Sequence, residues 1–468
     1  MMCAIVMLIL TLAQAHQPVH SLVQKAQSDF QAGNYGEARG LLLQALKGDS
    51  QNPALWRYLA LTDARLNQVD QAIADFQKAL HLEPRNAQNY FGLGLLDLLK
   101  GNSGQALAMY RKGLSLDPDD LAANQHYASL LMSAGRDGEA LQPLQKWAQI
   151  DCRDPAVHIA LIQCYVKSKM TQAGDLEIHK FLALRNLPTA QQLELAKSLE
   201  EDKEPSLEAE VLRHITKVSP HSAEAHAMLG AELANQHRFP EAGQELWDAV
   251  KQSPDSPQYS MEFAGTLLLW KRYPAALKFL TLVKDRFGKL PEYQYKLGLA
   301  YFGLSEYPQA IATLQPLAQQ HPNLEMVQYS LGNCYYSEGE FSKAERHYQR
   351  AIQLNPRNAL FYGAMGQLLR KESPPRFDEA ILNLEKALQL DPSRTQARFR
   401  LALCFEDQRE FAKAVPLLQQ VVREQPNLLA AHIALARTYY RLKRIPEGDR
   451  EKAIVTRLQN QTLGKSPQ

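Results

Sequence analysis

The chain has 468 residues, and its 52 basic and 50 acidic side chains leave a formal net charge of only +2. This balance argues against a nucleic-acid-binding protein, which needs basic residues gathered on one face. A hydrophobic content of 45% is enough to bury a continuous apolar layer, although a globular chain of this length usually divides into several domains.

The first fifteen residues have the character of an export signal. Residues 1–12 are apolar apart from Thr11, and Ala13-Gln14-Ala15 offers the small-x-small pattern of a signal-peptidase site. We therefore expect residues 1–15 to be a signal peptide, cleaved after Ala15, of a bacterial protein that reaches the periplasm or is secreted. The segment lacks a positively charged start, so a cytoplasmic protein with an uncleaved apolar end is the alternative.

No apolar run in the sequence is long enough to span a bilayer comfortably, the first twelve residues included. We therefore expect the mature chain to be soluble and to have no transmembrane segment.

A 34-residue period begins after the apolar segment and runs through most of the chain. Units start near residues 19, 53, 87, 121, 155, 189, 223, 257, 291, 325, 359 and 395. The only change of length is two extra residues in the unit 359–394, within residues 371–376. A chain that repeats one unit so regularly is typical of a scaffold, because a catalytic site needs residues that occur only once.

Each unit reads as two antiparallel helices. In the unit 325–358, Leu331 and Tyr335 belong to the apolar stripe of a first helix, and Gly339 follows where a left-handed residue can end it. Tyr348 lies on the apolar stripe of a second helix, which Pro356 stops. Small residues are expected where the two helices approach closely, and these are Gly332, Ala344 and Ala351.

These residues resemble the tetratricopeptide repeat (TPR) family, whose pattern is an aromatic, Leu-Gly, a Tyr, a turn Gly, an Ala, an aromatic, an Ala and a closing Pro. The segment from Tyr329 to Pro356 matches this pattern closely. The resemblance covers residues 19–428 as twelve units, and a partial thirteenth follows. It implies an all-α fold, an α-α superhelix (TPR solenoid) of about twelve to thirteen helix-turn-helix repeats.

We expect an N-terminal array over 19–222 (repeats 1–6) and a C-terminal array over 223–428 (repeats 7–12). A partial repeat with a capping helix over 429–460 and a disordered tail over 461–468 complete the chain. Repeats 5 and 6, residues 155–222, are degenerate. Ordinary drift of the repeat explains this, and a softer joint between two stiffer arrays is the alternative.

Some residue types are interpreted by their place in the unit. Cys164, Cys334 and Cys404 occupy the tenth position, which predicts small core residues, and a bridge from Cys152 to Cys164 is the alternative use. Three prolines lie inside second helices and predict local kinks, because each removes a backbone hydrogen bond. These prolines are Pro143, Pro316 and Pro416.

The sequence contains no phosphate-binding loop, no nucleophile elbow and no zinc-protease motif. The cysteine and histidine spacings do not match a metal site, and the thirteen histidines are scattered over many repeat positions. We therefore expect a protein that is not an enzyme and that has no cofactor, no metal and no small-molecule substrate. A cryptic enzyme is the third and weakest hypothesis.

Function must then come from a surface. The TPR resemblance implies that first helices line a concave groove and that positions five, nine and twelve contact partners. The candidate groove residues are Tyr295, Leu299, Phe302, Tyr329, Asn333, Tyr336, Gln367, Phe399 and Leu403. Aromatic side chains and amides suit an extended or helical peptide, although the rings have the alternative of packing between adjacent first helices.

One TPR-family mechanism is not expected here. Domains that clamp chaperone tails place Lys at position five and Asn at position nine of one unit, whereas the first unit here has Val23 and Gln27. The leading hypothesis is a non-enzymatic scaffold that binds partner peptides or proteins in the groove. The alternative is a cell-envelope assembly factor for secretion, pilus or polysaccharide machinery, which binds glycan or a membrane-protein partner.

Overall fold

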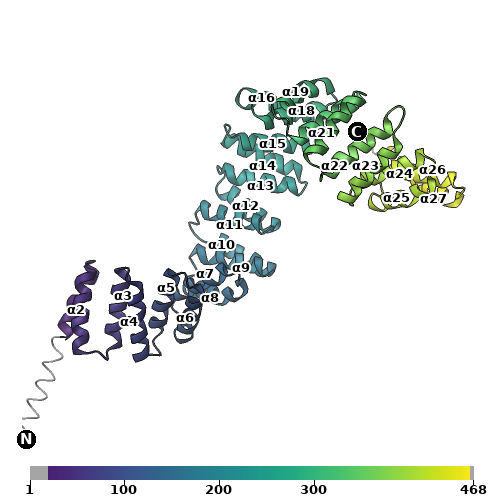
Figure 1. The fold of residues 1–468 in the computed structure, drawn as a ribbon. Coiled ribbons are helices and arrows are strands. Elements are labelled where there is room, and N and C mark those ends of the chain that lie inside the picture. The colour runs from purple at the N-terminus through teal and green to yellow at the C-terminus, as the bar shows by residue number, and fades with distance from the viewer. Residues whose placement is uncertain (1–18, 464–468) are drawn as a thin grey trace, which may run out of the picture. The chain divides into compact units, whose positions relative to one another are not determined.

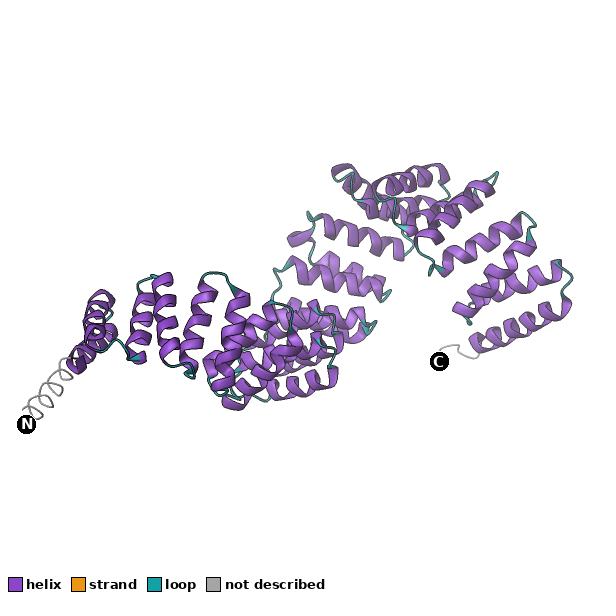
Figure 2. Cartoon of the chain, turned by 60° about the horizontal axis from the view of Figure 1, so that its bottom comes forward, coloured by secondary structure: helices purple, strands orange, loops and turns teal. Residues whose placement is uncertain are grey.

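The computed structural model of the protein describes residues 19–463. The expected signal peptide, residues 1–15, and most of the expected tail lie outside the described residues. Within residues 19–463 all regular structure is helical (Figure 2). This confirms the all-α fold class and the series of helix-turn-helix repeats.

The first helices of the units begin where the period places them, and most consecutive helices pack side by side in chain order (Figure 1). Residues 19–31 form the first of them. The others are α3 (Pro53–Arg65), α5 (Ala87–Leu99), α7 (Leu121–Ser133), α9 (Pro155–Lys167), α11 (Thr189–Glu201), α13 (Ala223–Asn235), α15 (Pro257–Leu269), α18 (Pro291–Gly303), α20 (Glu325–Ser337), α22 (Ala359–Lys371), α24 (Thr395–Asp407) and α26 (Leu429–Arg441).

The second helices return antiparallel to the first. They are α2 (Tyr35–Gly48), α4 (Val69–Leu82), α6 (Ser103–Leu116), α8 (Asp137–Ile150), α10 (Thr171–Leu182), α12 (Pro205–Val218), α14 (Phe239–Gln252), α16 (Tyr273–Leu282), α19 (Tyr307–Gln320), α21 (Phe341–Leu354), α23 (Phe377–Leu390), α25 (Phe411–Glu424) and α27 (Ile445–Leu463). In the unit 257–290 the second helix is interrupted at Val283, and the short α17 (Lys284–Phe287) follows it. The sequence pattern did not predict this interruption.

The turn between the two helices of a unit has left-handed backbone at the fifteenth residue of the unit. Gly339 has φ +80°, which confirms its expected role, and Gly33, Gly101 and Gly135 also have positive φ. Non-glycine residues adopt the same conformation at this position, at a steric cost that glycine avoids. They are Asn67, Lys169, Lys203, His237, Lys271, Ser305, Arg409 and Lys443.

The close approach of the two helices is measured at Gly332. A Cβ atom added there would lie 2.5 Å from the ring of Tyr348 on α21. That ring is held in place, because its hydroxyl donates a hydrogen bond of 2.7 Å to the side-chain carbonyl of Asn333. Ala344 and Ala351 are fully buried. The small residues of the period therefore set the distance between the helices, as expected.

A further contact ties neighbouring units together. The fourth residue of a first helix donates a side-chain hydrogen bond to the backbone carbonyl six residues earlier, where the preceding unit closes. The donors are Trp56, Tyr90, Asn124, His158, Gln294, Tyr362, Arg398 and His432. Backbone carbonyls beyond a helix end have no partner within the helix, so these side chains satisfy groups that the fold would leave unpaired.

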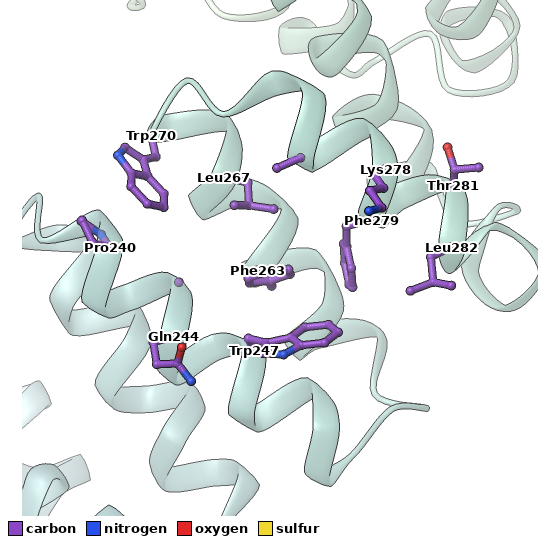
Figure 3. Close-up of a pocket in the computed structure, with 12 residues that line it drawn as sticks. Pro240, Gln244, Trp247, Phe263, Leu267, Trp270, Lys278, Phe279, Thr281 and Leu282 are labelled. Carbon is purple, nitrogen blue, oxygen red and sulfur yellow. The ribbon is translucent and has the colours of Figure 1, made fainter. Parts of the chain in front are cut away.

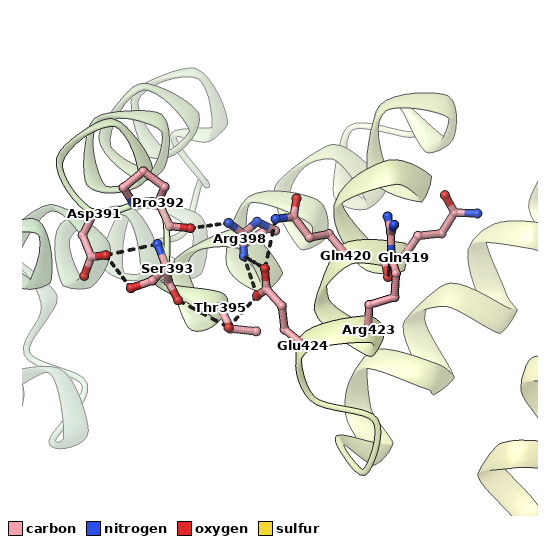
Figure 4. A network of polar contacts seen from close by, with 9 residues as sticks. All are labelled: Asp391, Pro392, Ser393, Thr395, Arg398, Gln419, Gln420, Arg423 and Glu424. Atoms are coloured by element: carbon pink, nitrogen blue, oxygen red, sulfur yellow. Dashed lines mark hydrogen bonds and ion pairs between the residues drawn. The ribbon is translucent and has the colours of Figure 1, made fainter. Parts of the chain in front are cut away.

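Arg398 shows the most extended form of this contact (Figure 4). Its guanidinium donates to the carbonyl of Pro392 and to both carboxylate oxygens of Glu424 on α25, at 2.7 and 2.6 Å. Glu424 also accepts from the hydroxyl of Thr395 at 2.7 Å. One arginine thus joins the end of one unit to both helices of the next.

The prolines and cysteines lie where the period places them. Pro143, Pro316 and Pro416 are inside α8, α19 and α25. Cys164, Cys334 and Cys404 are fully buried, and burial raises the pKa of each thiol to about 12. All described cysteines are free, so the alternative bridge between Cys152 and Cys164 is not formed.

The last repeat, which begins at Leu429, differs from the expectation of a partial repeat over 429–460 and a tail from 461. It contains two helices, and the second, α27, continues to Leu463. Residues 461–463 are therefore helical rather than part of a tail. The physical reason is that no proline or glycine stands between Gly448 and Gly464 to end the helix.

Contacts divide the chain into two compact units, residues 1–221 and 222–468. We refer to them as the N-terminal and C-terminal units. Within the C-terminal unit, successive first helices pack on one another, from α13 to α26, more extensively than successive second helices do. The first helices therefore line the shorter, inner face of this unit.

Candidate functional site

The candidate groove residues lie on the first helices of the C-terminal unit. All nine are half-buried, and together they span α18, α20, α22 and α24. Tyr295, Phe302, Tyr329 and Tyr336 pack against one apolar core that extends from Ala310 to Cys404. These rings therefore contribute to the stability of the solenoid and still present an edge to solvent, so packing and binding are not exclusive.

The ring of Tyr329 packs against two buried aromatic rings. The ring of Tyr329 lies 5.4 Å from Phe361 and 6.0 Å from Tyr348, measured between centroids. The hydroxyl of Tyr295 is 3.4 Å from the hydroxyl of Ser330 on the next first helix. The half-buried rings of Tyr295 and Tyr329 keep apolar surface that a bound peptide can cover.

The two amides in the predicted set are oriented by tyrosine hydroxyls. Tyr348 donates to the carbonyl oxygen of Asn333, which leaves the amide N–H groups of Asn333 for another acceptor. Gln367 uses its amide nitrogen to donate to the hydroxyl of Tyr336 at 3.0 Å, which leaves its carbonyl oxygen for another donor. A peptide backbone presents both complements, a carbonyl and an N–H group.

A cation lies among these rings that the sequence analysis did not select. Arg400 on α24 is half-buried, and its guanidinium donates to the backbone carbonyl of Gly363 at 3.1 Å. Burial lowers the pKa of Arg400, and the titratable groups that act on it are the hydroxyls of Tyr329, Tyr336 and Tyr348 and the cation of Arg370.

None of these neighbours is an anion. Arg370 itself pairs with Asp407 at 3.2 Å, whereas no carboxylate pairs with Arg400 within residues 19–463. A partly desolvated guanidinium without a counter-ion is costly in isolation and is prepared to accept an anionic group. We call Arg400, Tyr329, Asn333, Tyr336 and Gln367 the tyrosine–arginine surface.

The other predicted groove residues are not part of this surface. Phe399 and Leu403 pack against a different core, formed by α25 and α26 around Leu418 and Leu435. The ring of Phe302 contacts Tyr307 in its own turn, at 5.6 Å. Leu299 is half-buried on α18. The period placed all of these side chains on first helices, but it could not indicate which neighbour each would contact.

An apolar pocket of about 770 Å³ lies elsewhere in the C-terminal unit, between the second helices α14 and α16 and over the first helix α15 (Figure 3). Trp247, Phe263 and Phe279 form its floor, and the centroids of the two phenylalanine rings are 4.8 Å apart. Trp270 stands at one rim. Leu282, at the end of α16, is 74% exposed.

The rim of this pocket is positively charged. Lys278 lines it, and the guanidinium of Arg272 lies over the ring of Trp270 at 4.6 Å. Neither cation, nor the neighbouring Lys271, forms an ion pair in the described part of the chain. Exposed aromatic side chains beside unpaired cations are typical of a contact surface for a partner with apolar and acidic groups.

The pocket was not predicted because it depends on the interrupted second helix of the unit 257–290. A sequence signal was nevertheless present, since Trp247, Phe263, Trp270 and Phe279 bring four aromatic residues into two consecutive units. Arg400 likewise stood next to the selected Phe399. The selection considered positions five, nine and twelve and passed over the sixth.

One group of possible metal ligands is present, although none was expected from the sequence. Asp175, His179 and Glu210 bring their ligand atoms within 4.8 Å of one another in the N-terminal unit. Within the described residues, no helix combines the length and apolar character that a membrane span requires.

Comparison with protein families finds matches to part of the repeat region. Models described as tetratricopeptide repeat match residues 23–90, 91–155, 292–324 and 326–358. These segments of the chain are similar to tetratricopeptide repeats. A model of the anaphase-promoting complex, cyclosome, subunit 3, matches residues 375–450. TPR repeats support a role as a scaffold for protein–protein interaction.

Solved structures that are similar to this chain share little sequence with it. A chain of Naa15/Naa10 bound to HypK-THB has 13% identity and a TM-score of 0.45, with 95% of this chain and 76% of that chain covered. Yeast Tom70 has 16% identity and a TM-score of 0.44 (92% and 96% covered). A chain of the APC/C hetero-tetramer Cut9-Hcn1 has 14% identity and a TM-score of 0.42, with 94% of this chain and 96% of that chain covered. No curated protein sequence matches the chain.

Proposed function

We propose that this TPR protein is a non-enzymatic scaffold whose tyrosine–arginine surface binds an extended peptide that carries an acidic side chain. The observation that supports this most directly is Arg400, a half-buried guanidinium without a carboxylate partner in the described residues. The rings of Tyr329 and Tyr336 would cover apolar side chains of the peptide, and Asn333 and Gln367 would bond its backbone.

A selection from a phage library of random peptides tests this proposal on the full chain. We expect the selected peptides to contain an acidic residue and to bind Arg400→Met about 10- to 100-fold more weakly, because one charge-assisted hydrogen bond is lost and the apolar stem is kept. Arg357→Met, on an exposed turn, is the matched control. Selected peptides that bind the Arg400→Met variant and the Tyr329→Ala, Asn333→Ala double variant as tightly as the wild type would contradict the proposal.

The apolar pocket favours a second partner site on the same unit. We propose that it holds the apolar face of an acidic amphipathic helix, because its aromatic floor is flanked by Lys278, Lys271 and Arg272. In a selection from helical miniproteins, binders should depend on Trp247 and should lose affinity with Lys278→Glu but not with Lys284→Glu. Basic or neutral binders, or binders that tolerate Trp247→Ala, would show that this surface has another use.

The cellular place of the scaffold remains a separate proposal. The apolar residues 1–12 and Ala13-Gln14-Ala15 support export to the periplasm, which is also where the alternative role in cell-envelope assembly would operate. Fractionation followed by N-terminal sequencing should find a soluble mature chain that begins at His16. A full-length chain in the cytoplasmic fraction would favour the cytoplasmic alternative and remove the envelope role.

A further inference from the structure

Three side chains that commonly bind metal ions meet where the two degenerate repeats pack together. Asp175 and His179 lie one turn apart on α10, and Glu210 lies on α12, the second helix of the next repeat. All three ligand atoms are within 4.8 Å of one another, and Nε2 of His179 is 3.4 Å from Oε1 of Glu210.

The position of these side chains follows from the packing of the degenerate repeats. Within the N-terminal unit, α10 and α12 are the pair of successive second helices that pack most closely. Helix α10 has 12 residues, whereas α8 and α12 have 14. Elsewhere in this unit second helices are held apart by the first helices between them. Ligands from two repeats can therefore meet here.

The two carboxylates at this place have one basic partner in the described chain, the imidazole of His179. Neither carboxylate forms an ion pair with a lysine or arginine in the described chain, although Arg213 lies on the same helix as Glu210. Two carboxylates that face each other repel unless a proton or a cation lies between them.

The imidazole of His179 is oriented for a metal ion. Its Nδ1–H donates to the backbone carbonyl of Asp175 at 2.9 Å, which leaves the lone pair of Nε2 directed toward Glu210. Histidines that bind metals use this arrangement, in which the second ring nitrogen is fixed by a hydrogen bond. In a tetrahedral zinc site, bonds of 2.0–2.2 Å place two ligand atoms about 3.4 Å apart.

We propose that Asp175, His179 and Glu210 bind a divalent transition-metal ion such as Zn²⁺, which clamps α10 to α12 and stiffens the joint between repeats 5 and 6. Water completes the coordination in the fourth position. The nitrogen and oxygen ligands favour Zn²⁺, Co²⁺ or Ni²⁺ over Mg²⁺ and Ca²⁺, which prefer sites made entirely of oxygen. The clamp would convert a place that the sequence marks as irregular into a joint whose stiffness depends on metal supply.

Titration of the full, tag-free chain with Co²⁺ tests the site through the visible absorption of the bound ion. We expect saturation at one ion per chain, displacement by Zn²⁺ and no displacement by Mg²⁺. His179→Ala should weaken binding at least about tenfold. His126→Ala is the matched control, because His126 makes the same backbone hydrogen bond, to Ala122, without a neighbouring carboxylate pair.

A second readout follows the clamp itself. Amide hydrogen exchange in α10 and α12 should slow when Zn²⁺ is added to the wild type and should not change in Glu210→Gln, a variant of nearly the same shape. This variant keeps the proposal testable if His179→Ala folds poorly. The proposal is overturned if the wild type binds no ion stoichiometrically, or if both variants bind Co²⁺ as the wild type does.

Discussion

At the scale of single residues, substitution is most restricted where the repeat has its smallest side chains. Gly332 faces the ring of Tyr348, and that ring cannot turn away without losing its hydrogen bond to Asn333. Overpacking in such a contact forces strained rotamers or backbone shifts.

We therefore expect Gly332→Ala to lower the free energy of unfolding by about 1 to 3 kcal/mol, measured from the urea midpoint. Gly243→Ala, in another repeat of the C-terminal unit, is the matched control. A Cβ atom at Gly243, inside α14, would meet no atom within 4 Å. It should leave stability unchanged or raise it by about 1 kcal/mol, because alanine is the better helix former. Equal effects of the two substitutions would refute the role of close approach.

The buried His158 carries a positive charge in the folded protein. Its Nδ1 is 2.6 Å from a carboxylate oxygen of Glu177, and its Nε2 is 3.0 Å from the carbonyl of Cys152. Both partners only accept hydrogen bonds, so both ring nitrogens must donate. The hydrogen bond to Glu177 raises the pKa of His158, although burial opposes the shift.

This gives stability a defined dependence on pH. The contribution of a group whose folded pKa is raised is fully present below its unfolded pKa, about 6.5, and is lost as the pH rises through the folded value. The free energy of unfolding of the wild type should therefore fall more steeply above pH 6.5 than that of His158→Gln. Glutamine can still donate to the carbonyl, as Gln294 does in its own unit. Parallel pH curves for the two proteins would refute the charged state.

At the scale of helices, Arg398 illustrates how units are joined. It contacts the end of one repeat and both helices of the next, whereas an arginine such as Arg394 pairs with a carboxylate within one turn, Asp391. Surface pairs of that kind contribute little, because solvent screens them.

A series at this position separates the two contacts. Arg398→Ala should lower the free energy of unfolding by about 2 to 3 kcal/mol, since it removes a carbonyl bond and a charged pair. Arg398→Gln should recover part of the loss, because an amide can still bond the carbonyl of Pro392. Arg423→Ala on the exposed side of α25 should change stability by less than about 0.5 kcal/mol. If alanine and glutamine at position 398 behave alike in urea denaturation, the carbonyl bond has no measurable role.

The sequence period predicted the helices well for a physical reason. Each pair of helices depends on local features that recur every 34 residues. Examples are the left-handed turn at Gly339 and the small residue at Gly332, where the two helices meet. The tyrosine–arginine surface was predicted in part, because Tyr329 and Asn333 occupy regular positions. Arg400, the apolar pocket and the Asp175 cluster depend on which side chains of different units meet, and a pattern within one unit does not contain that information.

At the scale of the whole molecule, stability is distributed along the chain. Most helices pack on their neighbours in sequence, and the extensive helix–helix contacts join elements of the same repeat or of adjacent repeats. The free energy of such a protein is approximately a sum over units and the interfaces between them.

A cavity in one repeat should therefore destabilise mainly the helices that pack next to it. Leu314→Ala on α19, where the side chain is fully buried, should cost about 2 to 5 kcal/mol and should accelerate amide exchange in α18 to α21. Exchange in α3 to α6 should stay at the rate of the wild type. Leu382→Ala, at a position that is 65% exposed, provides the control. Faster exchange throughout both units would reveal a single cooperative structure instead.

The bond from the fourth residue of each first helix has a consequence for how such chains diverge. The backbone carbonyl there needs a hydrogen-bond donor on a side chain of suitable length. Indole, phenol, amide, imidazole and guanidinium groups all provide one. Selection can then exchange chemically unlike residues without breaking the stack. Residue identity at this position therefore differs from repeat to repeat while the pair of helices is kept.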